Sequence, residues 1–271
     1  MNSTGWANKE VPLAQLTVHG REFDIQAILF DKDGTLLDFV YTWGKWGELL
    51  LARFSAELAG RRLPVLPANL LEMWGIHYNE AGEFTGYDRN SPLSMGTVDD
   101  LLTLLAWEGY RLGLSWAEAR VLAETCRFAA DAGLEQSRTA KLIPGALPFL
   151  EQCERCGIKL GIVTSDDTTA AEEHLEWLGI RRYFSICLGA DRVNRGKPFP
   201  DMVESACQQI AVDVARTAVI GDTNGDMQMA RSAGAAAAIG LDTEGTVGKN
   251  GFPQADVVIA SYRHLSIRKG Q

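Results

Sequence analysis

Two aspartates separated by a single residue are the first feature of the sequence that could do chemistry. Asp31 and Asp33 directly follow the apolar run Ile25–Phe30, and Gly34 and Thr35 come next. On an extended chain such carboxylates project to the same side, and two that lie close together need a cation or a shifted pKa. Gly34 allows the chain to turn sharply after the run. The pair is therefore a candidate catalytic or metal site, although aspartates are also common in turns.

Three later segments carry polar groups at equivalent places. Thr164 and Ser165 end a second apolar run, Lys197 stands just before a helical pattern, and Asp222 and Asp226 follow a further apolar run. In an open parallel sheet the ligand site lies at the carboxyl ends of the strands. We therefore expect these groups and the first aspartates to meet in one crevice.

The chemistry of the converging groups suits phosphoryl transfer. Asp31, Asp222 and Asp226 would make an oxygen-rich, acidic pocket of the kind that Mg²⁺ prefers. Thr164 or Ser165 and backbone N–H groups can donate hydrogen bonds to phosphate oxygens, and we include Gly34 and Thr35 among the candidate substrate-binding residues. Lys197 can offset the negative charge and touch both Asp31 and a phosphate.

At these residues the sequence resembles the haloacid dehalogenase-like superfamily. Asp31 to Thr35 look like its first motif, Thr164 its second, Lys197 its third, and Gly221-Asp222 with Asp226 its fourth. The resemblance covers about residues 25–259 and suggests a phosphatase similar to the phosphoglycolate phosphatases. It implies a Rossmann-like parallel sheet core and an inserted helical cap of the C1 type.

The resemblance also implies a role for each residue. Asp31 would be the nucleophile that forms an aspartyl phosphate and a ligand of Mg²⁺, and Asp33 the general acid/base whose backbone carbonyl reaches the metal. Thr164 and Lys197 would hold the phosphoryl oxygens. Asp222 would bind Mg²⁺, with Asp226 in support.

Asp33 narrows the activity within the superfamily. An aspartate there can protonate the leaving oxygen and later deprotonate the attacking water. The dehalogenase and phosphonatase branches lack an aspartate at this position. We expect a phosphatase acting on a small phosphorylated metabolite; the alternatives are a sugar phosphomutase with the same intermediate and a non-catalytic protein that binds a phosphorylated metabolite.

The elements that must position these groups follow an alternating pattern. Short apolar runs alternate with helical patterns in the second half of the chain, which predicts an α/β fold with a parallel, doubly wound sheet. The expected strands are Ile25–Phe30, Ile158–Thr164, Ile186–Leu188, Thr217–Gly221, Ala235–Gly240 and Asp256–Ile259, and the expected helices are Asp167–Leu178, Pro200–Ile210 and Gly225–Ala233.

A long insertion interrupts this pattern after the first motif. Residues 38–142 show no convincing buried strand, and their apolar residues recur at helical spacing. We expect a helical cap over 38–142 and a catalytic core made of 1–37 and 143–271. The expected cap helices are Trp43–Leu58, Leu66–Trp74, Val98–Trp107 and Trp116–Ala130, the last with a capping box at Ser115 and Glu118.

The long segment Gly75–Gly96 should be a loop between cap helices, and long loops are often functional. His77, Arg89 and Ser91 in it are either substrate contacts or solvated loop residues. Four tryptophans of the cap should be core residues rather than substrate-stacking groups. They are Trp43, Trp46, Trp74 and Trp107.

Other segments receive simpler interpretations. Gln15–His19 and Glu22–Asp24 suggest a hairpin at the sheet edge, and the basic tail Ser261–Gln271 should be peripheral. Lys32 should point away from its two aspartate neighbours. We assign no role to His19, His174 or His264, which have no partner at a diagnostic spacing.

Composition limits the remaining possibilities. The formal net charge of −9 argues against a nucleic-acid or anionic-membrane surface. No apolar run approaches the roughly 20 residues of a membrane helix, and the first residues do not resemble a signal peptide. Cys153 and Cys156 lie in a helical pattern without further metal ligands, so we expect reduced thiols and a cytoplasmic protein. Both a monomer and a homodimer remain compatible with the sequence.

Overall fold

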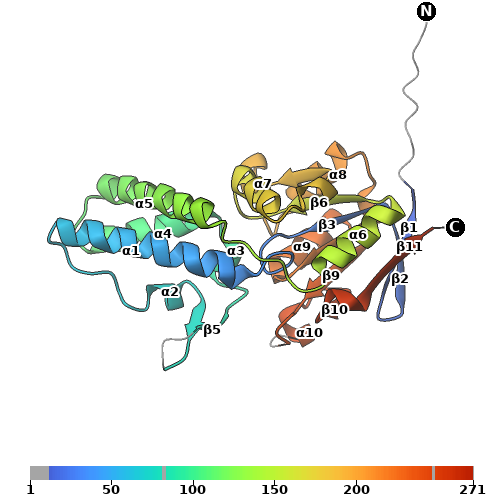
Figure 1. The fold of residues 1–271 in the computed structure, drawn as a ribbon, viewed down its shortest axis with the longest axis horizontal. Coiled ribbons are helices and arrows are strands. Elements are labelled where there is room, and N and C mark those ends of the chain that lie inside the picture. Colours follow the sequence, from blue (N-terminus) through green and yellow to red (C-terminus); the bar gives the residue numbers. More distant parts are fainter. Residues whose placement is uncertain (1–11, 81–83, 246–247, 271) are drawn as a thin grey trace, which may run out of the picture.

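The computed structural model describes residues 12–80, 84–245 and 248–270; residues 1–11, where we expect no signal peptide, lie outside them. Figure 1 shows a body built around a twisted sheet and, beside it, a second body of long helices. The expected α/β core with an inserted helical region is confirmed.

The core is organised around six parallel strands in the order β10-β9-β8-β3-β6-β7. All six expected runs form strands, two with the expected bounds and four with bounds shifted by one or two residues. These strands are β3 (Ala27–Phe30), β6 (Lys159–Val163), β7 (Ile186–Leu188), β8 (Thr217–Gly221), β9 (Ala237–Leu241) and β10 (Val257–Ile259).

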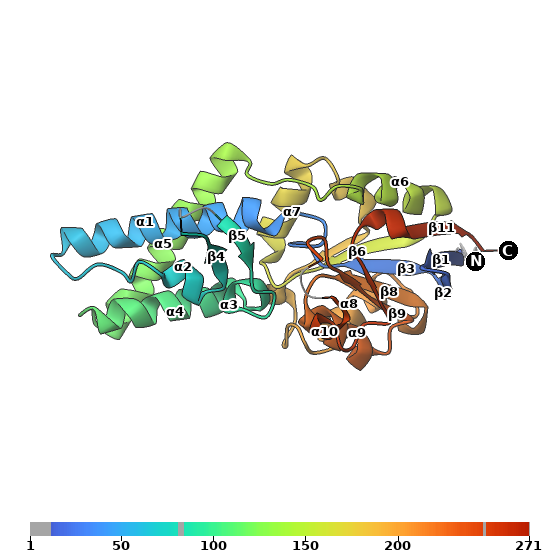
Figure 2. The same ribbon diagram turned by 90° about the horizontal axis from the view of Figure 1, so that it is seen from below.

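Helices cover both faces of this sheet (Figure 2). Ile28 and Phe30 of β3 pack on the face with α6 and α7, whereas Ala27 and Leu29 pack on the face with α8 and α9. Successive residues of a strand point to opposite faces, so a strand between two helical layers must be apolar throughout. The helices are α6 (Ala146–Cys156), α7 (Thr168–Trp177), α8 (Asp201–Gln209), α9 (Asn224–Ala233) and the short α10 (Gly248–Gly251). Cys153 and Cys156 of α6 are buried, free thiols.

A second, antiparallel sheet corrects the interpretation of both chain ends. The expected hairpin forms as β1 (Ala14–Val18) and β2 (Arg21–Ile25), but it belongs to a separate sheet with β11 (Leu265–Lys269), in the order β11-β1-β2. The basic tail is therefore not peripheral. Its residues Leu265 and Ile267 are buried because they alternate toward the core beneath this sheet.

The inserted region has a hydrophobic core of its own. Its elements are α1 (Lys45–Gly60), α2 (Leu70–Met73), β4 (Ile76–Tyr78), β5 (Phe84–Tyr87), α3 (Pro92–Met95), α4 (Val98–Arg111) and α5 (Trp116–Ser137), with one turn of π-helix at Val40–Gly44 before α1. The expected capping box starts α5, since the Ser115 side chain accepts from the Glu118 N–H and Glu118 accepts from the Ser115 N–H. Two segments connect this region to the core, and they run side by side. Leu37 forms a β-bridge with Leu142, and the Asp38 N–H donates to the Lys141 carbonyl.

Three expectations for this region are wrong. The expected helix Leu66–Trp74 shrinks to α2, because prolines at 64 and 67 limit it. The segment Gly75–Gly96 contains the hairpin β4–β5 and the helix α3 rather than only a loop. Trp107 is 52% exposed, whereas the other three tryptophans are buried as expected, because its position on α4 faces away from the packed side. No helix in the described part of the chain has the length and apolarity needed to cross a membrane.

Candidate active site

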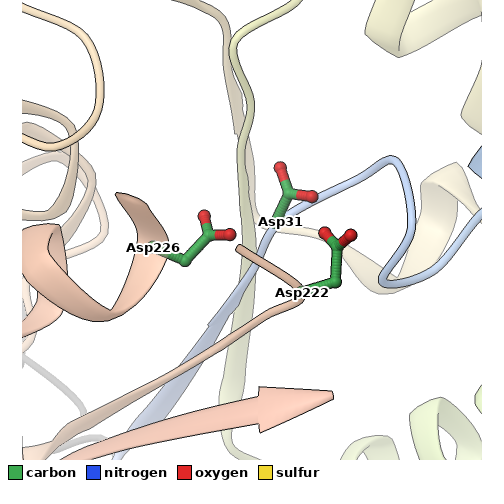
Figure 3. A group of neighbouring side chains, drawn as sticks. All are labelled: Asp31, Asp222 and Asp226. Atoms are coloured by element: carbon green, nitrogen blue, oxygen red, sulfur yellow. The ribbon is translucent and has the colours of Figure 1, made fainter. Parts of the chain in front are cut away.

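Three buried carboxylates meet where two neighbouring strands end. Asp31 follows β3, Asp222 follows β8, and Asp226 lies in the first turn of α9. One oxygen from each lies within 4.8 Å of the others, and Figure 3 shows the side chains converging. The structure therefore brings together the three acidic groups that the sequence suggested as metal ligands.

The turn after β3 is shaped to admit Asp222. Gly34 has φ +77°, and a Cβ there would lie 2.2 Å from Asp222 Oδ2, so only glycine fits both the backbone and the space. The Thr35 hydroxyl donates to Asp222 Oδ1 at 3.3 Å, and the Thr35 carbonyl accepts from the Tyr262 hydroxyl at 2.9 Å. Gly34 and Thr35 thus position Asp222 in this arrangement.

Asp226 is held by the helix that carries it. Its Oδ2 accepts from the Thr223 N–H at 3.1 Å and from the Thr223 hydroxyl at 2.6 Å, which completes a capping box at the start of α9. This arrangement fixes one oxygen and leaves Oδ1 directed to Lys197, 2.7 Å from its ammonium.

Lys197 is the cation of the cluster. Its ammonium forms ion pairs with Asp31 and Asp226, and its side chain is only 6% exposed. Burial alone would lower the pKa of this ammonium, but the two carboxylates raise it above its ordinary value. Lys197 therefore stays charged, as phosphate binding requires.

The carboxylates themselves are poorly neutralised. Burial raises the pKa of Asp31 well above its usual value, against the opposing effect of Lys197 and with a further increase from Asp226 and Asp222. Burial likewise raises the pKa of Asp222 to about 6. Carboxyl groups with pKa values raised in this way would be stabilised in their charged form by an additional cation.

A divalent metal fits this donor set. Three carboxylates lie within reach of one ion, and oxygen ligands with excess negative charge are what Mg²⁺ selects. The carboxylate of Asp33 is not part of this trio, and the expectation for Asp33 concerned its backbone carbonyl instead.

Lys32 does not point away from Asp33, contrary to our expectation. Its buried ammonium lies 2.7 Å from Asp33 Oδ2, 3.0 Å from Asp166 Oδ2 and 3.0 Å from His174 Nδ1. The alternation rule fails because β3 ends at Phe30 and the chain is turning by Lys32. Sequence reasoning missed Asp166 and His174, since nothing in their spacing marks them as partners of a residue far along the chain.

The cap region reaches into the site through the last residue of β5 and the segment that follows it. The Tyr87 hydroxyl donates to Asp222 Oδ2 at 3.0 Å, and Arg89 Nη1 donates to the Asp222 carbonyl at 3.1 Å. Arg89 and Ser91 are buried, so neither is a solvated loop residue. His77, the third candidate of this segment, is exposed.

Thr164 and Ser165 lie beside the carboxylates. With Asp31, Asp33 and Lys197 they line a small cavity of about 30 Å³. Residues of the cap region, including Phe39, Trp43 and Leu93, close its other side. The residues that we expected to contact phosphate therefore line this one cavity. Gly34 and Thr35 are the exceptions, because they lie against Asp222.

Comparison with known proteins agrees with this geometry. A model of the haloacid dehalogenase-like hydrolases matches residues 25–234. The chain belongs to this family. Among its relatives, phosphoglycolate phosphatase of Escherichia coli K12 is 30% identical over 215 residues, which are 78% of this chain and 79% of that protein. The match to the probable phosphatase IndB of Dickeya dadantii is 38% identical over 96 residues, which are 35% of this chain and only 42% of that protein.

Solved structures of haloacid dehalogenase-like hydrolases share the fold. A predicted phosphoglycolate phosphatase from Haemophilus somnus 129PT superimposes with a TM-score of 0.65 at 22% identity, covering 88% of this chain and 95% of that one. At this identity the likeness establishes the fold, and function rests on the site.

Proposed function

We propose that the protein is a Mg²⁺-dependent phosphatase that hydrolyses a small phosphorylated metabolite through an aspartyl phosphate on Asp31. One observation carries the proposal: the buried Asp31 carboxylate is paired with Lys197 and shares its pocket with Asp222 and Asp226. A nucleophile, a phosphate-binding cation and a set of metal ligands are thereby in contact with one another.

In the first half-reaction an oxygen of Asp31 attacks phosphorus. The bond from Asp31 to phosphorus forms, the ester bond to the leaving oxygen breaks, and Asp33 gives its proton to that oxygen. Lys197 offsets charge on the phosphoryl oxygens, and the Thr164 hydroxyl, at the wall of the same cavity, donates to one of them.

In the second half-reaction water releases the phosphate. Asp33 takes a proton from the water, the water oxygen attacks phosphorus, and the bond to Asp31 breaks, which regenerates the carboxylate. Lys32 holds Asp33 Oδ2 at 2.7 Å. The other oxygen, Asp33 Oδ1, is buried and has no hydrogen-bond partner among the described residues, so it is free to carry the proton.

The remaining groups support these steps. Asp31, Asp222 and Asp226 would hold Mg²⁺, which when bound neutralises charge on the phosphoryl group. We propose that residues 38–142 act as a cap whose Phe39, Trp43 and Leu93 keep bulk water from the cavity.

Hydrolysis is favoured over transfer to a second sugar hydroxyl, since the relatives compared above carry phosphatase names. A mutase would convert a sugar phosphate to an isomer faster than it frees phosphate.

The test is phosphate release from an aryl phosphate by the purified protein. Activity should require Mg²⁺, disappear with EDTA, return with added Mg²⁺ and fall by at least about a thousandfold in Asp31→Asn. Turnover that survives in the variant would exclude Asp31 as the nucleophile. A protein that binds phosphorylated ligands without any turnover would be a binding protein instead.

A further inference from the structure

A second, larger cavity lies between the cap region and the core. It has a volume of about 380 Å³, within the usual range for small-molecule sites. Its walls come from α5 and the start of α1 on one side and from α7 on the other. It shares Trp43, Val98 and Asp166 with the small cavity over Asp31. The two cavities are therefore neighbours, and the larger one is the adjoining space for the rest of a molecule whose phosphate sits at Asp31.

The lining of the larger cavity is acidic. The described lining includes one arginine, Arg127, and five carboxylates, which are Asp131, Asp166, Asp167, Glu173 and Asp191. Outside the lining, Lys32 pairs with Asp166 and Arg192 with Asp191, so the carboxylates still outnumber the cations. Clefts lined by one sign of charge concentrate ligands of the opposite sign.

The positive charge of Arg127 is already matched within the protein. Its Nε lies 3.1 Å from Asp131 Oδ2, and its Nη2 lies 3.1 Å from Asp167 Oδ2. An anionic ligand that approached this guanidinium would therefore also meet the two carboxylates that already balance its charge.

His174, the other basic side chain of the lining, does not add a charge. Burial and the neighbouring Lys32 ammonium lower its pKa to about 3, so the ring is neutral near pH 7. The Lys32 ammonium itself lies behind the wall, against Asp33 and Asp166.

Aromatic faces complete the cavity. Trp43, Trp46 and Trp177 are part of its lining. Indole rings attract cations through their electron-rich faces, and their flat apolar surfaces pack against the C–H faces of ring compounds. Carboxylates and indoles together suit hydroxyl and ammonium groups and disfavour a second anion, because like charges brought together repel each other.

We propose that this cavity receives the leaving group of the substrate and selects one that bears hydroxyl or amino groups and no anionic substituent. The proposal rests on the proposed phosphatase function. It names the substrate class as phosphate monoesters of polyols, sugars or amino sugars, and it excludes carboxylated and doubly phosphorylated compounds.

Three six-carbon monophosphates test this selection, since apart from the phosphate they are cationic, neutral and anionic in turn: glucosamine 6-phosphate, sorbitol 6-phosphate and 6-phosphogluconate. The value of kcat/KM should be at least about tenfold higher for the first two than for the carboxylated compound. Equal values, or a preference for 6-phosphogluconate, would overturn the proposal.

A charge reversal shows whether the cavity is responsible. Glu173 is an exposed residue of α7 on the cavity wall, and Glu176, on the same helix, is exposed and outside the lining. Glu173→Lys should reduce the ratio of kcat/KM for glucosamine 6-phosphate over 6-phosphogluconate by about fivefold or more, whereas Glu176→Lys should keep the wild-type ratio. An equal effect of both substitutions would show that the cavity does not set the preference.

The two proposals fail in different ways. If no phosphate ester is turned over, including an aryl phosphate, the phosphatase assignment is wrong. Calorimetric dissociation constants for the same three compounds then decide the cavity proposal: tighter binding of the amino sugar supports it, and equal or tighter binding of 6-phosphogluconate overturns it.

Discussion

Arg89 of the cap region donates to the backbone carbonyl of Asp222 at 3.1 Å, and the same guanidinium nitrogen lies 3.4 Å from the Asp222 carboxylate. It also donates to the Leu241 carbonyl at 2.9 Å. Arg89 is 5% exposed, so these contacts form away from bulk water. A buried cation of the cap region thereby fixes this segment on the core, and it would compete with a metal ion held by Asp222.

Replacing this arginine should separate the two effects. Arg89→Met should tighten Mg²⁺ binding at least about threefold, because a cation beside Asp222 is removed, and should lower kcat/KM, because the cap segment loses its anchor. Calorimetric titration with Mg²⁺ and steady-state kinetics measure the two quantities. Arg53→Met, on the exposed side of α1, is the matched control. Unchanged Mg²⁺ affinity in Arg89→Met would show that Arg89 does not oppose the metal.

Lys197 should be essential for stability as well as activity. Lys197→Met leaves Asp31 and Asp226 buried without their cation. Breaking a buried ion pair in this way costs about 3–5 kcal/mol, and added Mg²⁺ should recover part of the loss. Urea unfolding with and without Mg²⁺ measures both. In Lys141→Met, which breaks the exposed pair with Asp38, the loss should stay below about 1 kcal/mol.

Asp222 should control metal affinity. Asp222→Asn removes one of the three carboxylates that could hold the ion, so the Kd for Mg²⁺ should rise at least about tenfold. Asp99→Asn, which changes the same charge in the first turn of α4, should bind Mg²⁺ as the wild type does. Equal affinities in wild type and Asp222→Asn would place the metal elsewhere.

His174 should make stability depend on pH. Its pKa falls from 6.5 to about 3 on folding, so between these values the unfolded chain binds more protons at this residue. The contribution of the neutral His174 ring to the free energy of unfolding is complete above about pH 6.5. It is lost as the pH falls toward 3, by up to about 1.4 kcal/mol per pH unit.

His174→Gln isolates this contribution. Lys32, Asp33 and Asp166, which face the ring, remain in both proteins. The free energy of unfolding, measured by urea between about pH 4.5 and 6.5, should depend less steeply on pH in the variant. Parallel pH profiles would contradict a neutral, buried His174.

The core and the catalytic constellation could be predicted from the sequence because both depend on local signals. Apolar runs such as Thr217–Gly221 end where polar residues begin, and parallel strands bring such ends to one edge. Asp31, Asp222 and Lys197 therefore met as expected, although they lie far apart in the chain.

The remaining contacts depend on tertiary structure that no local pattern shows. The pairing of β11 with β1 joins the two ends of the described chain. Lys32 lies in a turn, where strand alternation does not apply, and its partner His174 comes from α7. The positions of Tyr87 and Arg89 against Asp222 require the cap to fold back on the core.

The central claim is that the phosphoryl group passes through Asp31. The most direct measurement is to quench the protein during turnover, reduce it with borohydride, which converts an aspartyl phosphate to homoserine, and locate the change by peptide mass spectrometry. We predict homoserine at position 31 in wild type and none in Asp31→Asn. Reduction at another carboxylate, or an unmodified Asp31 peptide while phosphate is being released, would contradict the mechanism.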